Sequence, residues 1–327
     1  MNNKYEELKK QFGEKLRFNE PLAPYTTYKI GGPADLFYTA LTGDELVRIV
    51  IASRTLKIPV FVLGGGSNIL FGDKGFRGLV IKNNAGVIAI RGMKGKVKGE
   101  NKESLVFIEA DSGVPMNKLV RFTIEEGLGG LEMHLGLPGT VGGAVYMNSK
   151  WTKPNGFVGD SLYQATILTV SNKLKNVGKG YFRFSYGKSS LQASEDILIS
   201  VVFVLKQEDK EILWRRANES ALYRKETQPQ GVHTAGCVFK NISLTDALSE
   251  GTPDHTTSVG YLIDKSGGKG MRVGGAEVSA VHANFILTRS GATASDVVKL
   301  IEKVRKSVKQ KFKITLREET LRVGEFY

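Results

Sequence analysis

The sequence predicts an α+β protein rather than a doubly wound parallel sheet, and two observations support this. β-Branched stretches typical of strands occur at residues 60–63, 105–110 and 197–205, without the regular strand–helix–strand spacing of a parallel sheet. Glycine is enriched, with 38 among 327 residues, and it clusters in two segments instead of scattering. The chain is therefore expected to combine mixed sheets and helices with two glycine-rich loops.

Local signals place the expected helices and strands. Thr42 with Glu45 forms a capping-box pattern, and Thr293 with Asp296 forms a second one. Apolar side chains follow the second pattern on one face over about five turns, which predicts a long amphipathic helix. Further helices are expected at residues 1–16, 115–126 and 208–225, and strands at 60–63, 78–82, 105–110, 164–170, 197–205 and 314–323.

The formal charge of +13 indicates a protein that attracts anions, and the sequence must be searched for the kind of anion it binds. Much of the positive charge lies in local runs such as residues 91–102, a pattern typical of a solvated hairpin or loop. A nucleic-acid patch and a field that attracts small phosphorylated ligands are the alternatives. Because the basic runs lack interleaved aromatic side chains, nucleic acid is not expected as a partner.

Cysteine usage and hydropathy limit the class of protein. A single cysteine excludes an internal disulfide framework, and without a second one no metal site is expected. The charged N-terminal segment lacks the apolar stretch of a secretory signal, and apolar runs such as residues 197–205 are too short to cross a bilayer. We therefore expect a protein of the reducing cytoplasm without membrane insertion.

The first glycine cluster is V-L-G-G-G-S-N-I-L at residues 62–70, directly after an expected strand. Glycine lets backbone approach a ligand closely and exposes N–H groups, which suits a diphosphate. The cluster matches neither the G-x-x-x-x-G-K-[ST] phosphate loop nor the G-x-G-x-x-G dinucleotide fingerprint. A tight strand-to-loop turn is the alternative interpretation.

The second glycine cluster covers residues 127–148 and is too rich in glycine for a regular helix or a strong strand. We expect an extended loop system, and long ordered loops are usually functional. Two such loops in one chain favour a large nucleotide cofactor over a small metabolite. His134 lies within the second cluster, where a structural role is more usual for a lone histidine than a ligand role.

Six motifs in order resemble the UDP-N-acetylenolpyruvoylglucosamine reductase family over nearly the whole chain. The motifs are Y-T-T-Y-K-I-G-G-P-A-D at 25–35, L-G-G-G-S-N at 63–68, G-L-P-G-T-V-G-G-A at 136–144, T-A-G-C-V-F-K-N at 234–241, G-G-A-E-V-S at 274–279 and H-A-N-F at 282–285. The C-terminal helix and strand continue the likeness. The chain looks like the shorter, second type of the family.

The resemblance implies a vanillyl-alcohol-oxidase-type, two-part FAD-binding domain followed by a smaller α/β substrate-binding domain. The expected boundaries are 1–85 and 86–207 for the two FAD-binding parts and 208–327 for the substrate domain. It also implies that NADPH reduces FAD, which then reduces a UDP-linked enolpyruvyl sugar to UDP-N-acetylmuramate. The expected partner is this small molecule, and the expected assembly is a monomer or a weak homo-oligomer.

The resemblance assigns binding roles to residues in and near the motifs. The expected FAD contacts are Ile30, Gly31, Leu63, Gly64, Gly65, Gly66, Ser67, Asn68, Gly136, Pro138, Gly139, Thr140, Gly142, Gly143 and Ala144. The expected substrate contacts are Arg224, Lys240, Asn241, His282 and Asn284. Structural roles are the alternative for His282 and Asn284, and a solvated helix charge is the alternative for Arg224.

Two positions carry the chemistry that the resemblance implies. Cys237 stands where the family commonly has a serine that donates the proton, and a thiol with a reference pKa of about 8.5 is mostly protonated at neutral pH. A buried, inert cysteine is the alternative. Glu319 aligns with the family's catalytic glutamate, whereas Glu318 would face the other side of a strand.

The chain departs from the family where an arginine usually neutralises the substrate carboxylate. Gly187 occupies that position, and the neighbouring Lys188 is a substitute point charge without a bidentate fork. Residues 149–156 replace a usual run of small residues, and Ile242 replaces a proline. A flavin- and UDP-sugar-binding homologue with impaired catalysis is therefore the main alternative function, and a flavin oxidase on the same scaffold is another.

Overall fold

The computed structural model describes residues 3–98, 101–151 and 156–326. The helices are α1 (Asn3–Phe12), α2 (Gly43–Thr55), α3 (Met116–Glu125), α4 (Val141–Tyr146), α5 (Lys210–Thr227), α6 (Leu244–Ser249), α7 (Val259–Lys265) and α8 (Ala294–Phe312). The strands are β1 (Arg17–Pro21), β2 (Pro33–Ala40), β3 (Val60–Leu63), β4 (Ile69–Phe71), β5 (Phe76–Asn83), β6 (Ile88–Lys98), β7 (Asn101–Asp111), β8 (Leu128–Gly129), β9 (Lys150–Trp151), β10 (Gly156–Phe157), β11 (Leu162–Leu168), β12 (Leu174–Gly178), β13 (Ile197–Gln207), β14 (Arg272–Val273), β15 (Ala276–Val278), β16 (Ile286–Thr288) and β17 (Leu321–Val323).

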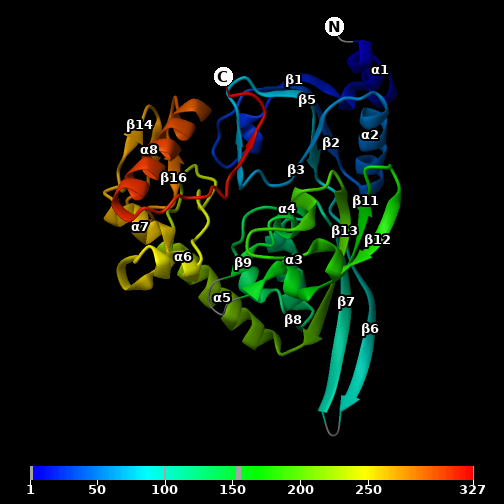
Figure 1. The fold of residues 1–327 in the computed structure, drawn as a ribbon. Coiled ribbons are helices and arrows are strands. Elements are labelled where there is room, and N and C mark those ends of the chain that lie inside the picture. The colour runs from blue at the N-terminus through cyan, green and yellow to red at the C-terminus, as the bar shows by residue number, and fades with distance from the viewer. Residues whose placement is uncertain (1–2, 99–100, 152–155, 327) are drawn as a thin grey trace. The chain divides into compact units, whose positions relative to one another are not determined.

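The strands pair mainly antiparallel, in mixed sheets. One sheet has the order β1-β2-β5-β3, in which β3 and β5 are parallel. The largest has the order β12-β11-β13-β7-β6, with β8 also paired to β13. β6 and β7 pair antiparallel over a long stretch (Figure 1), so the described residues of the basic run at 91–102 lie in paired strands, in agreement with the hairpin interpretation.

The chain divides into two compact units that each draw on separate segments. Unit 1 contains residues 1–17, 37–65 and 79–224, and unit 2 contains residues 18–36, 66–78 and 225–327. The chain passes from unit 1 to unit 2 between Gly65 and Gly66, inside the first glycine cluster, and again within α5.

Unit 1 has a core between the large sheet and its helices. β7 and β13 place alternate apolar side chains on one face, among them Ile108 and Val201, which are fully buried. α3 covers this face with Leu119 and Val120. The helix has no side-chain cap, so burial of its apolar stripe is what stabilises it.

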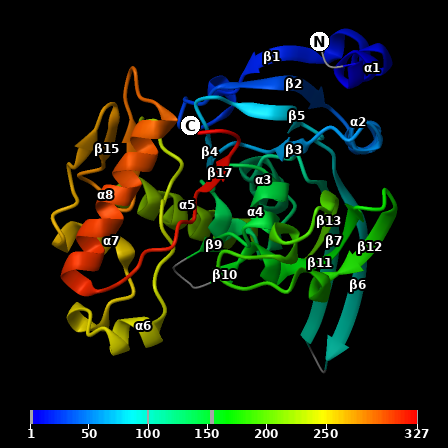
Figure 2. The same cartoon turned by 45° about the horizontal axis from the view of Figure 1, so that its top comes forward.

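Unit 2 has its own core around α7 and α8. Figure 2 shows α8 beside β15, α7 packs against α8, and α8 buries an apolar stripe that includes Val297, Ile301 and Val304. Thr293 and Asp296 cap α8 reciprocally, as the sequence predicts. Tyr28 from the early part of the chain is fully buried in the same core.

The structure corrects two sequence expectations. The second glycine cluster is not wholly loop, because it contains α4, whose Val141 and Val145 are buried and whose Thr140 side chain caps the first turn. Tertiary burial thus outweighs the poor helix propensity of its glycines. The expected strand at 314–323 shortens to β17, which pairs in parallel with β4.

Candidate active site

The two glycine clusters meet backbone to backbone within unit 1. A side chain added at Gly65 would place its Cβ 2.5 Å from Gly139 Cα, and one added at Gly64 would lie 2.5 Å from Thr140 Oγ1. No real Cβ tolerates such distances, so the approach itself requires glycine. The sequence predicted both clusters as cofactor loops, and the structure brings them together.

The end of β5 holds both loops. Lys82 is opposite Leu63 in the parallel pair of β3 and β5, and its Nζ donates to the Gly64 carbonyl. The neighbouring Asn83 donates from Nδ2 to Ser112 Oγ over 2.8 Å. The Ser112 carbonyl in turn accepts from Gly142 N at 2.8 Å, within the second loop.

These loops fit a nucleotide diphosphate. The first loop follows β3 at the carboxyl end of the parallel pair β3–β5, where open sheets usually bind such ligands, and the second loop packs against it. The ammonium of Lys82 adds a positive charge beside the first loop. The residues present are therefore suited to the anionic part of FAD.

The other predicted cofactor residues are divided between the two units. Leu63, Gly136, Pro138, Gly143 and Ala144 belong to unit 1, and Ile30, Gly31, Gly66, Ser67 and Asn68 belong to unit 2. In unit 2, Gly66 has a φ of +65° and a Cβ there would lie 2.1 Å from the Tyr25 carbonyl oxygen. This turn therefore also requires glycine.

Cys237 and Glu319 lie on neighbouring backbone segments of unit 2. Glu319 N donates to the Val238 carbonyl at 2.7 Å, directly after Cys237. On its other side Cys237 forms a bridge with Phe285. Asn68 Nδ2 donates to the Glu319 carbonyl at 3.0 Å, so the first glycine cluster contacts the same segment. Residues far apart in the sequence are thus assembled into one site.

The Glu319 carboxyl is poised to titrate near neutral pH. Burial raises the pKa of Glu319 to about 7, and the positive charge of Lys240 opposes this shift. Lys240 is held beside it because Lys240 N donates to the Arg317 carbonyl at 2.9 Å. A carboxyl group with this pKa is both a hydrogen-bond donor and an acceptor at neutral pH.

Glu318, by contrast, is fully engaged in ion pairs. Arg305 Nη2 on α8 lies 2.5 Å from Glu318 Oε1, and Arg322 Nη2 lies 2.7 Å from the same oxygen. The sequence predicted that the two glutamates face opposite sides. The structure gives them different surroundings, an ion-pair network for Glu318 and a desolvated setting for Glu319.

Asn284 and His282 support the Cys237 segment. Asn284 is buried, its Oδ1 accepts from Phe239 N at 3.0 Å, and its Nδ2 donates to the Phe239 carbonyl at 2.8 Å. His282 Nδ1 accepts from Asn284 N at 3.2 Å, and burial lowers the pKa of His282, so its ring is neutral. These contacts favour the structural alternative for Asn284.

The remaining predicted residues fall in both units. Asn241 Oδ1 accepts from Val259 N at 3.1 Å, at the start of α7. Lys188 belongs to unit 1 and is exposed. Its neighbour Gly187 has a φ of +62°, a left-handed conformation that an arginine there would adopt only with strain. The backbone of the turn at Gly187 is therefore unfavourable for an arginine. Residues 152–155 of the other departure lie outside the described part of the chain.

Arg224 and His134 lie together in unit 1. The Arg224 guanidinium stacks over the Trp151 ring at 4.7 Å, and its Cδ would lie 3.2 Å from a Cβ at Gly136. Burial lowers the pKa of His134 to about 4, and the nearby Arg224 adds to the shift. His134 is therefore neutral, and its buried Nδ1 has no hydrogen-bond partner among the described residues.

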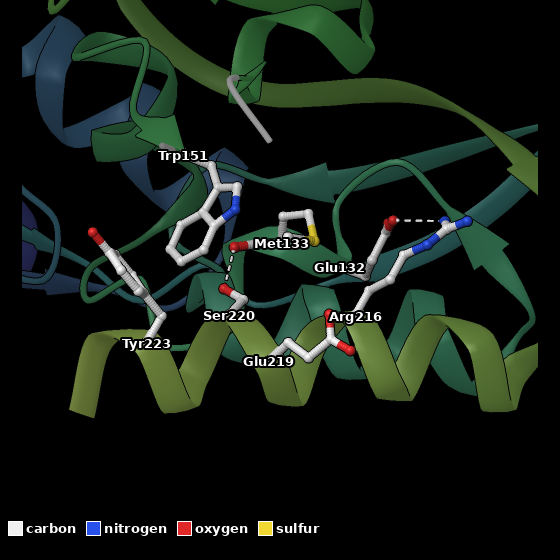
Figure 3. Close-up of a pocket in the computed structure, with 7 residues that line it drawn as sticks. All are labelled: Glu132, Met133, Trp151, Arg216, Glu219, Ser220 and Tyr223. Carbon is white, nitrogen blue, oxygen red and sulfur yellow. Dashed lines mark hydrogen bonds and ion pairs between the residues drawn. The ribbon is translucent and has the colours of Figure 1, made fainter. Parts of the chain in front are cut away.

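A pocket of about 420 Å³ in unit 1 is lined by none of the predicted binding or catalytic residues, although Arg224 stacks on Trp151, which lines it (Figure 3). Trp151 and Tyr223 form one side, and an ion pair of 3.2 Å between Glu132 and Arg216 forms the other. Between them Ser220 Oγ donates to the Met133 carbonyl at 2.7 Å. No sequence motif indicated this pocket, nor did any indicate Lys82.

Comparison with known proteins agrees with this geometry. Residues 34–178 match the family model of an FAD binding domain, and residues 228–323 match that of the C-terminal domain of UDP-N-acetylenolpyruvoylglucosamine reductase. The reductase of Desulforamulus reducens is 36% identical over 95% of this chain and 94% of its own. That of Bacillus subtilis is 34% identical over 99% of both chains.

A solved structure supports the same assignment. The crystal structure of the reductase from Thermus caldophilus matches with a TM-score of 0.71 and 32% identity, over 94% of this chain and 98% of that one. The fold and the matched domains thus define an FAD-containing oxidoreductase. The chain belongs to the UDP-N-acetylenolpyruvoylglucosamine reductase family. The predicted fold class, an α+β FAD-binding region followed by a C-terminal domain, is confirmed.

Proposed function

We propose that this protein reduces UDP-N-acetylglucosamine enolpyruvate to UDP-N-acetylmuramate, with NADPH as reductant and FAD as cofactor, in peptidoglycan precursor synthesis. Family membership supports the substrate and the cofactor. The observation that carries the chemistry is the Cys237–Glu319 arrangement. A thiol and a carboxyl group with a pKa of about 7 lie on adjacent backbone segments.

The glycine loops would hold the cofactor. Because glycine lets the loops pack at Gly64, Gly65 and Gly139, backbone N–H groups of these loops would be the groups that bind its diphosphate. When bound, FAD supplies two-electron chemistry, taking hydride from NADPH and giving it to the enolpyruvyl double bond. The protein's own residues must then manage one proton and the charge on the substrate.

Cys237 would supply the proton. Hydride addition to one carbon of the double bond leaves a carbanion, delocalised as an enolate, on the carbon next to the carboxylate. The Sγ–H proton passes to that carbon, the double bond becomes single, and the thiolate regains a proton from solvent. A general acid of this kind contributes about 10²- to 10⁴-fold in rate.

Glu319 would stabilise the enolate. Because its pKa is about 7, the carboxyl group is partly protonated at neutral pH and donates a hydrogen bond to the developing negative oxygen. Lys240 places a positive charge beside it. Lys188 would face the substrate carboxylate as a substitute for the family's arginine, and Arg224 would help orient the substrate.

Anaerobic stopped-flow kinetics with the flavin-loaded protein test this proposal. NADPH should bleach the flavin absorbance, and UDP-N-acetylglucosamine enolpyruvate should then restore it. If NADPH bleaches the flavin and the sugar never restores it, the protein is not this reductase. Rapid reoxidation by oxygen in the absence of the sugar would instead identify an oxidase.

A binding protein with impaired catalysis is the second candidate. The left-handed backbone at Gly187 favours it, because the turn differs from one that presents an arginine to the substrate carboxylate. The same stopped-flow trace distinguishes the two by its second phase. We further propose a cytoplasmic protein that is a monomer or a weak homo-oligomer, which sedimentation over a range of concentrations tests. Among the described residues, none of the helices is sufficiently long and apolar for a membrane span.

A further inference from the structure

Lys82 is a cation without an acidic partner in the described part of the chain. It lies on β5 in unit 1, and its side chain is half-buried rather than solvated. Its Nζ donates to the Gly64 carbonyl, and no carboxylate of the described residues forms an ion pair with it. Desolvation alone lowers the pKa of Lys82, with no compensating acidic charge.

Burying a charged ammonium group costs free energy unless an anionic group lies close to it. Buried or half-buried ammonium groups are normally paired with carboxylates, because burial without a counter-charge disfavours the ion. A single neutral carbonyl satisfies one of the three N–H donors of the ammonium. The residues that the structure describes therefore supply no negative group at this position.

The position of Lys82 indicates which anion it meets. Lys82 is level with Leu63, at the carboxyl ends of the parallel strands β3 and β5, where the first glycine loop begins. The carbonyl it binds belongs to Gly64, a residue in direct backbone contact with the second loop. The ammonium of Lys82 thus lies beside the contact between the two glycine loops.

We propose that Lys82 is a binding residue for the diphosphate of FAD, with its ammonium pairing with a phosphate oxygen while it holds the Gly64 carbonyl. This rests on the proposed function, because it requires that the glycine loops hold FAD. No sequence motif marks the residue, which occurs in an ordinary strand pattern. A charge-assisted hydrogen bond of this kind changes affinity by about 10- to 100-fold.

Titration of the flavin-free protein with FAD tests the proposal. Lys82→Met removes the charge and the donor, whereas Lys82→Gln removes the charge and keeps an N–H donor for the Gly64 carbonyl. Both variants should raise the Kd for FAD by about 10- to 100-fold. Lys118→Met is the matched control, because Lys118 Nζ also donates to a backbone carbonyl, that of Gly86, from an exposed position. Its Kd should equal that of the wild type.

The melting temperature of the flavin-free variants separates binding from folding. If Lys82 serves the cofactor, Lys82→Met should melt no lower than the wild type, because the substitution removes an uncompensated charge. A Lys82→Gln variant that binds FAD like the wild type, or flavin-free variants that melt much lower, would overturn the proposal and leave the function standing. A wild-type protein that binds no FAD would instead overturn the proposed function, and this inference with it.

Discussion

The candidate residues of unit 1 and those of unit 2 are built on opposite principles. In unit 1 the glycine loops omit side chains, and this omission allows the close approach of Gly65 to Gly139. In unit 2 the important groups are the side chains of Cys237 and Glu319, held by hydrogen bonds between neighbouring backbone segments. The first arrangement suits the recognition of a diphosphate, and the second suits the transfer of a proton.

This difference determines which kind of mutation impairs each group of residues. A glycine loop is sensitive to steric bulk, because one added carbon meets backbone that has no room to move. The acid cluster is sensitive to charge and protonation, because its volume is hardly changed by a conservative substitution. Mutations can therefore separate cofactor binding from chemistry.

The largest effect is expected from Glu319→Gln in the sugar half-reaction. The amide keeps the shape but is a weaker hydrogen-bond donor to the enolate, so the rate of flavin reoxidation by the sugar should fall about 10²- to 10⁴-fold. Flavin reduction by NADPH should change little. Glu318→Gln is the control, because Glu318 pairs with Arg305 and Arg322. Equal losses in both variants would contradict the assignment of Glu319.

The same variant should alter the pH dependence of stability in the flavin-free protein. Folding raises the pKa of Glu319 from its usual 4.5 to about 7, so the native state holds a proton that the unfolded state releases. The stability that this bound proton gives the native state is fully present below pH 4.5 and is lost as the pH rises through 7. Relative to Glu319→Gln, the wild type should lose up to about 3 kcal/mol of unfolding free energy over this range. Urea unfolding at several pH values measures the difference, and parallel curves for the two proteins would refute the shifted pKa.

Gly65→Ala should disrupt the glycine loops of unit 1 and leave Cys237 and Glu319 in unit 2 unchanged. The new Cβ would lie 2.5 Å from Gly139 Cα, so the loops must separate and FAD affinity should fall by at least about 100-fold. Flavin content after purification and titration of the flavin-free protein give the readout. Gly178→Ala is the control, because no atom lies within 4 Å of a Cβ there. Full flavin content in Gly65→Ala would show that the loops do not hold FAD.

The fold could be predicted from sequence wherever the signal is local. The cap of α8 is read from Thr293 and Asp296, and its apolar face is read from periodicity alone. α4 was missed, because helix propensity counts its glycines against a helix, while the burial of Val141 and Val145 decides the outcome. Long-range packing is not visible in a window of a few residues.

The candidate site shows the same limit. The motifs indicated Cys237 and Glu319 separately, but their proximity depends on a hydrogen bond between Glu319 N and the Val238 carbonyl. No sequence motif identifies Lys82, because it lies in an ordinary strand pattern. Its contact with Gly64 depends on the pairing of β3 with β5. The raised pKa of Glu319 arises from burial, which only the folded chain reveals.

Cys237 can be tested by removing its acidity in two steps. Cys237→Ser keeps a proton donor of higher pKa and should slow flavin reoxidation by the sugar about tenfold, whereas Cys237→Ala should slow it by about 100-fold or more. Both variants should bind FAD and accept electrons from NADPH normally. Single-turnover kinetics with the prereduced protein measure the step. Equal, undiminished rates in both variants would exclude Cys237 as the donor.

Lys188→Ala is expected to have the smallest effect on the rate of flavin reoxidation by the sugar. It tests whether Lys188 replaces the family's arginine. Lys188 is exposed and offers a point charge without a fork, so in the proposed role it would stabilise the substrate carboxylate less than a bidentate guanidinium would. Its removal should slow the sugar half-reaction by about tenfold or less, with NADPH reduction unchanged. Gly187→Arg in the Lys188→Ala background should not restore the rate, because the backbone at Gly187 has a φ of +62°. Recovery in that double variant would contradict this reason and show that the backbone at Gly187 can present an arginine to the substrate.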